Sequence, residues 1–287
     1  MAKSFSIAPD KHPQPEGKPR RVLVTGAAGR LGRSFVERSG SHYEFRLMVR
    51  PGDDATGLES YGEVVEVELL DLEGLKRAAD GIDTVVHLAA EPSPLATWSA
   101  LLPNNIQGTY HVFVAAKSAG CRRVVFASSI HAVSGYPADM QVKTSDPINP
   151  GDLYGVSKVF GEALGRYMAE QEGLSCIAIR IGAAAPIERA AHSRSLYMMD
   201  AFLSYDDLQQ LLERAIDDEQ VQFAIVHGVS NNRFKRLDIT TTRQILGYNP
   251  KDDLTRVNPH LRELDLHGSI GSHSLADGFP SGIREEL

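Results

Sequence analysis

A tyrosine and a lysine stand four residues apart in the segment Tyr154-Gly155-Val156-Ser157-Lys158. On a helix, residues with this spacing lie on one face, one turn apart, so the pattern places an ammonium beside a phenol. A free phenol has a pKa of about 10 and is a poor acid or base at neutral pH. A fixed cation favours the phenolate, so we expect Lys158 to lower the pKa of Tyr154 toward the working range. Because the same short motif also occurs as an unrelated surface pair, the rest of the chain must decide its meaning.

A glycine-rich turn precedes this pair in the chain. The apolar run 21–25 predicts a buried strand, and the segment after it opens a helix. Gly26 permits the tight turn, Gly29 lets a pyrophosphate approach the backbone, and Gly32 lets the helix pack against the strand. Free N–H groups at a helix start favour an anion. This order of elements predicts a dinucleotide site, with the turn contributing Gly26, Ala28, Gly29, Arg30, Leu31 and Gly32.

The second predicted strand, 45–50, ends where the adenosine ribose of a dinucleotide normally lies. An acidic residue there would bind the 2′-hydroxyl, whereas an arginine would accommodate a 2′-phosphate. The strand ends in Arg50, which favours NADP over NAD as the cofactor. In the alternative, Arg50 is solvated and Asp53 or Asp54 takes the ribose, with NAD as the cofactor.

Further strands are predicted at 64–72, 84–90, 123–131, 175–181 and 221–226, with helical patterns between them. Strands that alternate with helices predict an α/β fold, here a Rossmann-like doubly wound parallel sheet of about seven strands. We expect a mobile arm over 1–19, a dinucleotide-binding domain over 20–182, a small substrate-binding region over 183–266, and a mobile tail over 267–287. The substrate-binding region should add one further strand and helices, and its segment 183–200 is predicted to be a loop over the active site.

Composition narrows the class of function. The 287 residues carry a net charge of −7 without a basic block, which argues against nucleic-acid binding. Two cysteines, Cys121 and Cys176, indicate a reducing, cytoplasmic setting rather than a disulfide framework. No apolar run approaches the roughly 18 residues that a membrane helix needs. The histidines are scattered without the spacing of a metal site. A small-molecule substrate is therefore expected.

The spacing GxxGxxG, followed in the expected order by YxxxK, resembles the extended group of the short-chain dehydrogenase/reductase superfamily. The resemblance implies that Ser129 completes a catalytic set with Tyr154 and Lys158, and that Asn105 supports a proton-relay water near the lysine. It also implies that Asp71 and Leu72 contact adenine, although Asp71 could instead cap the helix 72–79, and capping is likewise the other reading of Asn105. Small residues at the fourth strand end would let the cofactor pass closely, and the cofactor set is completed by Leu88, Ala89, Ala90, Tyr154, Lys158 and Ile181.

Several longer stretches are similar to the uronate dehydrogenase family: 25–32 (TGAAGRLG), 124–129 (VVFASS), 153–162 (LYGVSKVFGE), 180–182 (RIG), 223–231 (FAIVHGVSN) and 248–252 (YNPKD). In that family, C1 of a cyclic uronic acid is oxidised to an aldarolactone and the hydride passes to NAD, so the resemblance implies this reaction. It also implies substrate contacts from Ser93, Ser129, Ile130, His131, Tyr154, Arg194 and Tyr197.

The sequence departs from the family pattern at the substrate end. Ile130 replaces an asparagine, and Ala183-Ala184-Ala185 replaces polar residues. Tyr197 stands where the family has a carboxylate-binding arginine, so Arg194 or Arg189 must supply the guanidinium if an acid is bound. Losing hydrogen bonds to sugar hydroxyls costs on the order of 1 kcal/mol each. The catalytic residues are therefore better determined than the substrate.

Three other interpretations remain open from the sequence. The chain could be a nucleotide-sugar epimerase or dehydratase that retains its cofactor, a reductase of a less polar carbonyl, or a non-enzymatic dinucleotide sensor. The short C-terminal part argues against the first of these, and the intact Ser129, Tyr154 and Lys158 argue against the sensor. The resemblance also implies a homodimer formed through the helices that follow Asn105 and Tyr154, although the monomer's own sheet could equally cover their apolar faces.

Overall fold

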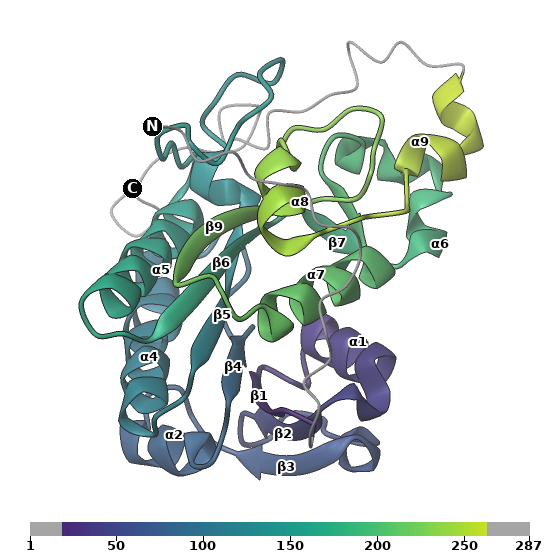
Figure 1. The fold of residues 1–287 in the computed structure, drawn as a ribbon. Coiled ribbons are helices and arrows are strands. Elements are labelled where there is room, and N and C mark those ends of the chain that lie inside the picture. Colours follow the sequence, from purple (N-terminus) through teal and green to yellow (C-terminus); the bar gives the residue numbers. More distant parts are fainter. Residues whose placement is uncertain (1–18, 263–287) are drawn as a thin grey trace.

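A seven-stranded sheet of order β3-β2-β1-β4-β5-β6-β9 forms the centre of the computed structural model, which describes residues 19–262 (Figure 1). Every neighbouring pair of strands is parallel. The strands are β1 (Arg21–Thr25), β2 (Glu44–Val49), β3 (Gly62–Glu66), β4 (Thr84–His87), β5 (Arg123–Ser129), β6 (Ser175–Ile181) and β9 (Phe223–Gly228). The strand order reverses between β1 and β4, and this confirms the predicted doubly wound, Rossmann-like sheet.

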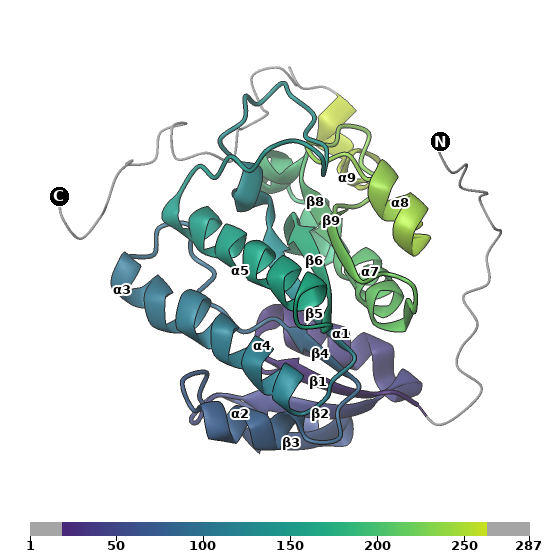
Figure 2. The ribbon, with the colours of Figure 1, turned by 60° about the vertical axis from the view of Figure 1, so that its left-hand side comes forward.

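Helices cover both faces of the sheet (Figures 1 and 2). Along β1, Val22 and Val24 join the core cluster that includes α1 and α7, whereas Leu23 joins the cluster that includes α2, α4 and α5. This alternation follows from the two-residue period of a strand, and because both faces are covered the strands read as nearly continuous apolar runs. The principal helices are α1 (Arg30–Ser39), α2 (Leu72–Ala79), α4 (Gly108–Ser118), α5 (Leu153–Glu170), α7 (Tyr205–Asp217) and α8 (Thr240–Leu246).

A continuous helical run leads into α4. It begins with α3 (Trp98–Leu101) and continues through a π-helical segment (Leu102–Gln107). Pro103 lies inside this run, and a proline cannot donate the regular helical hydrogen bond. The wider π turn is a feature that recurs near functional sites.

The region after β6 adds β9 to the main sheet and also forms a second, two-stranded sheet from β7 (Ala183–Ala185) and β8 (Phe202–Ser204). The expectation of a loop over 183–200 is therefore wrong. Ala185 and Phe202 are buried in an apolar cluster of their own, which gives this segment a fixed structure. The remaining short helices are α6 (Ile187–Ala190), α9 (Leu254–Val257) and the 3₁₀ turns Gly40–His42, Leu58–Ser60, Ile130–Val133, Ser193–Met198 and Pro259–Arg262.

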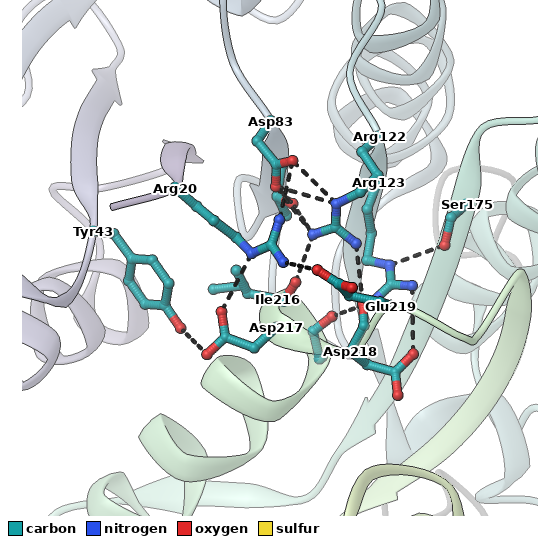
Figure 3. A network of polar contacts seen from close by, with 12 residues as sticks. Arg20, Tyr43, Asp83, Arg122, Arg123, Ser175, Ile216, Asp217, Asp218 and Glu219 are labelled. Atoms are coloured by element: carbon teal, nitrogen blue, oxygen red, sulfur yellow. Dashed lines mark hydrogen bonds and ion pairs between the residues drawn. The ribbon is translucent and has the colours of Figure 1, made fainter. Parts of the chain in front are cut away.

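Three arginines, Arg20, Arg122 and Arg123, cluster at the amino ends of the strands and are called the arginine clamp below (Figure 3). Arg122 makes a two-pronged contact with Asp83, with Nε–Oδ2 and Nη2–Oδ1 distances of 3.0 Å. Arg20 contacts Glu219 at 2.7 Å. The guanidinium of Arg123 is almost fully buried and donates to the backbone carbonyls of Ala215, Asp218 and Val221. The clamp thus fixes the end of α7 and the chain after it to the sheet.

The expected arm over 1–19, apart from its last residue, and the expected tail over 267–287 lie outside the described residues. None of the helices within 19–262 is long and apolar enough to cross a membrane.

Candidate active site

The glycine turn between β1 and α1 has no room for a side chain at Gly26 or Gly32. Gly26 has a φ of +71°, and a Cβ there would lie 2.9 Å from the backbone of Ala89. A Cβ at Gly32 would lie 2.3 Å from the carbonyl oxygen of Gly26. Gly29 is the N-cap of α1 and its side-chain position is exposed. A bare backbone at a helix start is the cradle that a dinucleotide pyrophosphate requires, so these residues fit the predicted cofactor.

A pocket of about 330 Å³ lies beside this turn, at the carboxyl ends of the strands around the β1/β4 switch point. Ligands of doubly wound sheets bind at this place. The predicted residues that line the pocket are Gly26, Ala28, Gly29, Arg50, Leu88, Ala89 and Ala90. The lining is completed by Asp53 and Asp54 and by six residues that the sequence did not indicate: Met48, Val49, Val67, Glu68, Leu69 and Asn104.

Asp71 and Leu72 do not line this pocket, in contrast to what the family resemblance implied. Asp71 is the N-cap of α2, where its carboxylate accepts a hydrogen bond from the N–H of Gly74 at 2.9 Å. Leu72 packs against the core beneath α2 and α4. Because β3 ends at Glu66, the chain reaches the pocket three residues earlier than expected, at Glu68 and Leu69.

Arg50 is exposed and is held by Asp53 at the rim of the pocket. Asp53 accepts from the backbone N–H of Arg50 at 3.1 Å and from its guanidinium at 2.9 Å. Asp54 supports the same loop by accepting from the N–H of Thr56. Asp53 therefore pairs with the guanidinium on which the NADP expectation rests, in a contact that solvent screens.

Three other predicted cofactor residues lie at element ends. Arg30 and Leu31 begin α1, with Arg30 exposed and Leu31 packed against the core. Ile181 ends β6 and is buried in the same core cluster.

Ser129, Tyr154 and Lys158 come together as the motif predicts. Ser129 ends β5, and Tyr154 and Lys158 lie in the first two turns of α5, which starts after the N-cap Asp152. The Ser129 hydroxyl hydrogen-bonds the Tyr154 phenol. The Lys158 Nζ lies 5.5 Å from the centroid of the Tyr154 ring and 5.3 Å from that of Phe126. These groups are buried, so their interactions are little screened by water.

The expected effect of Lys158 on the pKa of Tyr154 is wrong for the chain without a cofactor. Burial is the largest cause that raises the pKa of Tyr154 to about 12; the Ser129 hydrogen bond lowers this pKa, and the charges of Asp152 and Glu91 add smaller increases. Burial also lowers the pKa of Lys158 to about 8. Desolvation therefore outweighs the attraction that the spacing alone predicts.

Asn105 lies in the π-helical segment and is almost fully buried. Its side-chain amide makes two hydrogen bonds with the backbone of Glu91: it accepts from the N–H at 2.8 Å and donates to the carbonyl at 3.0 Å. It also donates to the Ser157 hydroxyl at 2.9 Å, which in turn donates to the Tyr154 carbonyl. Asn105 therefore joins the loop after β4 to the first turn of α5.

The residues after β5 divide between core and site. Ile130 is buried in an apolar cluster with Val133 and Val142. His131 lies with its ring edge-on to Tyr154, at 5.5 Å between centroids. Its Nδ1 lies 2.6 Å from the Asp152 carboxylate. The His131–Asp152 pair, between residues 21 positions apart, had no signal in the sequence.

The substrate-end residues lie on separate elements. Ser93, in the loop after β4, donates its N–H to the Glu91 carboxylate at 3.0 Å. Arg194 and Tyr197 lie on the 3₁₀ turn Ser193–Met198 and are exposed. The guanidinium of Arg189, on α6, donates to the Tyr197 hydroxyl at 3.3 Å. Arg189 therefore lies beside the position where the family pattern has its arginine.

Within residues 19–262, no group of three or more His, Cys, Asp or Glu side chains could hold a metal ion.

Known proteins resemble this chain in sequence and in fold. The sequence profile of the NAD dependent epimerase/dehydratase family matches residues 22–185. The chain is 37% identical over 256 residues to the L-arabinose 1-dehydrogenase (NAD(P)(+)) of Haloferax volcanii, covering 83% of this chain and 98% of that protein. It is 34% identical over 232 residues to the uronate dehydrogenase of Pseudomonas putida, covering 81% and 84%.

A solved structure shows the same fold. A mutant of uronate dehydrogenase from Agrobacterium tumefaciens, in complex with NAD, superposes with a TM-score of 0.75 at 33% identity. The match covers 85% of this chain and 89% of the other.

Proposed function

This chain belongs to the NAD dependent epimerase/dehydratase family, and on that premise we propose that it is an NAD(P)-dependent dehydrogenase of sugar acids or related sugars. The proposed reaction is oxidation of C1 of a cyclic uronic acid to a lactone. The observation that carries the proposal is the hydrogen-bonded pair of Ser129 and Tyr154 next to Lys158. The pocket at the glycine turn, which these three residues do not line, supports the dinucleotide. Relatives named as uronate and L-arabinose dehydrogenases support the substrate class.

In this mechanism each residue has a separate task. The bound nicotinamide supplies hydride acceptance, which no side chain can provide. The Ser129 hydroxyl orients the substrate oxygen. Because the pKa of Tyr154 is about 12 in the free chain, the mechanism requires that the bound cofactor and substrate favour the phenolate, which then takes the proton of the C1 hydroxyl as the C1–H bond is broken. Lys158 holds positive charge beside that phenol and would bind the nicotinamide ribose. The glycine turn would hold the pyrophosphate, and Asn105 keeps the loop after β4 fixed to α5.

We propose NAD rather than NADP as the preferred cofactor. Arg50 would contact the 2′-phosphate when NADP binds instead. The pairing of Arg50 with Asp53, together with Glu68 in the pocket wall, supports this preference, because a 2′-phosphate would meet two carboxylates. In the variant Asp53→Asn the guanidinium loses its charged partner. The ratio of kcat/KM for NADP to that for NAD should then rise about 10-fold, equivalent to about 1.4 kcal/mol. An unchanged ratio would contradict the preference.

For an acidic substrate, we propose that the guanidinium comes from Arg189 or Arg194. The contact of Arg189 with Tyr197 supports Arg189, because it orders the long side chain near the family's arginine position. The variants Arg189→Met and Arg194→Met separate the two residues. The one that binds the carboxylate should raise KM for D-glucuronate about 10–100-fold and leave KM for a neutral sugar unchanged.

The first test is cofactor reduction with D-glucuronate, D-galacturonate and L-arabinose, each with NAD and with NADP. Turnover of either acid supports uronate oxidation. Turnover of L-arabinose alone would agree with the apolar Ile130 and Ala183-Ala184-Ala185, and would shift the proposal to neutral sugars. No turnover with any of them, in protein that binds NAD, would overturn the proposed substrate class.

The second test concerns the proton. Tyr154→Phe removes the phenolic oxygen and should lower kcat by about 10²–10⁴-fold with little change in the NAD dissociation constant. Tyr110→Phe, an exposed tyrosine on α4, is the matched control. Equal turnover in wild type and Tyr154→Phe would exclude the mechanism.

We further propose a homodimer formed through α4 and α5, in the cytoplasm. Tyr110 and Tyr167 are about half exposed on these helices, which lie next to each other in Figure 2. Large exposed aromatic residues are enriched at interfaces. Replacing both with Glu should convert a dimer to a monomer in size-exclusion chromatography with light scattering, and a monomeric wild type would refute the proposal.

A further inference from the structure

The carboxylate of Asp152 makes two hydrogen bonds, one with each oxygen. As the N-cap of α5, its Oδ1 accepts from the N–H of Gly155 at 2.7 Å. Its Oδ2 lies 2.6 Å from Nδ1 of His131. An N-cap needs only the first of these bonds, as Asp71 shows at the start of α2. The second bond therefore calls for its own explanation.

The pair connects both halves of the proposed catalytic set. The backbone N–H of His131 donates to the Ser129 hydroxyl at 3.2 Å, and the His131 ring lies edge-on to Tyr154. Asp152 starts the helix that carries Tyr154 and Lys158. His131 thus lies between the end of β5 and the start of α5, where the reacting oxygen would be held.

The two fully buried histidines of the described residues differ in their bonding: His87 has both ring nitrogens bonded, to Thr25 and Thr109, whereas His227 is bonded at Nδ1 and its Nε2 is enclosed without a hydrogen-bond partner. His131 is also bonded through Nδ1, but its side chain keeps 19% of its exposure and is not enclosed as that of His227 is. Its Nε2 is therefore available to a ligand.

The partner of Nδ1 decides what Nε2 can do. A carboxylate can only accept, so Nδ1 carries a proton; in the tautomer with no second proton, Nε2 has a lone pair. We propose that Asp152 is a positioning residue that holds His131 in this tautomer, so that Nε2 accepts a hydrogen bond from the substrate hydroxyl next to the reacting carbon. This inference rests on the proposed function and deepens it, because it requires a substrate with a hydroxyl at C2. It makes His131 one polar contact that offsets the apolar Ile130 and Ala183-Ala184-Ala185.

The variant Asp152→Asn separates this role from helix capping. Asparagine retains the oxygen that caps α5, but its amide N–H donates toward Nδ1 and drives the proton to Nε2. The ring then offers a donor where an acceptor is needed. The value of kcat/KM for D-glucuronate or L-arabinose should fall about 10–100-fold, as for other residues that orient a functional histidine. The NAD dissociation constant should stay within twofold of wild type, and thermal stability should be kept.

Two controls accompany the kinetics. Asp253→Asn changes the N-cap of α9 in the same way and should leave kcat/KM unchanged, because Asp253 contacts Arg233, Thr255 and Arg256 and not His131. The 2-deoxy analogues of D-glucuronate and L-arabinose lack the proposed partner. They should be poor substrates of the wild type, and their kcat/KM should be less than threefold lower in Asp152→Asn than in the wild type.

A measurement without substrate decides the tautomer. In ¹⁵N NMR of the ring nitrogens, with His131→Gln used to assign the signals, wild type should show a protonated Nδ1 and an unprotonated Nε2. Asp152→Asn should show the reverse. A wild-type ring protonated on Nε2, or Asp152→Asn with kcat/KM within threefold of wild type, would overturn the inference. If the wild type turns over none of the sugars, the proposed function and the substrate contact both fail, while the NMR result still establishes or refutes the role of Asp152.

Discussion

Replacing Lys158 with methionine should stabilise the cofactor-free protein while it abolishes turnover. Lys158 is buried on the core side of α5, and burial lowers its pKa from 10.5 to about 8. A shift of that size corresponds to about 3 kcal/mol of folding free energy at pH 7. Contacts of the ammonium with the rings of Phe126 and Tyr154 return about 1–2 kcal/mol. Methionine has a similar length and no charge to desolvate, so the net gain should be about 1–2 kcal/mol.

The stability difference between Lys158→Met and wild type should depend on pH. The pKa of Lys158 is lower in the folded than in the unfolded protein, so the unfolded chain binds more protons between pH 8 and 10.5. The penalty of the charged lysine is complete below pH 8 and is relieved as the pH rises through this window. It should fall from about 3 kcal/mol at pH 7 to about 1 kcal/mol at pH 10. The advantage of Lys158→Met over wild type should therefore shrink or reverse at pH 10.

The assay is urea unfolding of cofactor-free wild type and Lys158→Met at pH 7 and pH 10, followed by circular dichroism. The exposed Lys143→Met is the control and should change stability by less than about 0.5 kcal/mol at either pH. Two results would refute the reasoning that burial of the ammonium destabilises the free protein. One is a Lys158→Met protein that is less stable than wild type at pH 7. The other is a difference in unfolding free energy between variant and wild type that is the same at pH 7 and pH 10.

Three further predictions concern the frame around the site. Gly32→Ala should destabilise by about 1–3 kcal/mol and weaken NAD binding, measured by thermal unfolding and calorimetry, because its Cβ would lie 2.3 Å from the Gly26 carbonyl oxygen. Glu162→Gln should lower the free energy of unfolding in urea by about 3–5 kcal/mol. The reason is that the Glu162 carboxylate accepts from the buried guanidinium of Arg180 at 2.8 and 2.9 Å and from the Ser128 hydroxyl. A decrease below about 1 kcal/mol would contradict this prediction. Burial raises the pKa of Asp83, but the hydrogen bonds from Arg122 and Thr84 and the charges of Arg122 and Arg20 outweigh burial, so the pKa is lowered. Ionised Asp83 therefore stabilises the folded protein, and this stabilisation is lost as the pH falls through the pKa of Asp83 in the folded state. Asp83→Asn should therefore flatten the loss of stability below about pH 4 in acid unfolding followed by circular dichroism.

Local patterns explain why much of this protein can be read from its sequence. The glycine turn and the Tyr154–Lys158 spacing depend on contacts within a few residues, so both are found where predicted. The sheet order follows from alternating strands and helices. The residues of the pocket wall at Glu68 and Leu69 were missed because the pattern does not show where β3 ends.

Properties that depend on the whole fold could not be predicted in this way. The pKa of Tyr154 reflects burial by elements distant in sequence, so the neighbouring lysine alone gave the wrong direction. The His131–Asp152 contact arises because β5 ends opposite the start of α5. The small sheet of β7 and β8 was missed because Ala183-Ala184-Ala185 has no strand-like pattern.

The arginine clamp has a consequence for how the chain folds during synthesis. The guanidinium of Arg123, in the middle of the sheet, finds its backbone acceptors at residues 215, 218 and 221, which are made about 90 residues later. A nascent chain that ends near residue 182 would have to bury this cation with the Ser175 hydroxyl but without its three backbone acceptors, or leave the strand edge open. We therefore expect the dinucleotide-binding part and the region after it to fold as one unit, with the cofactor pocket stable only after α7 and the residues that follow it have been synthesised.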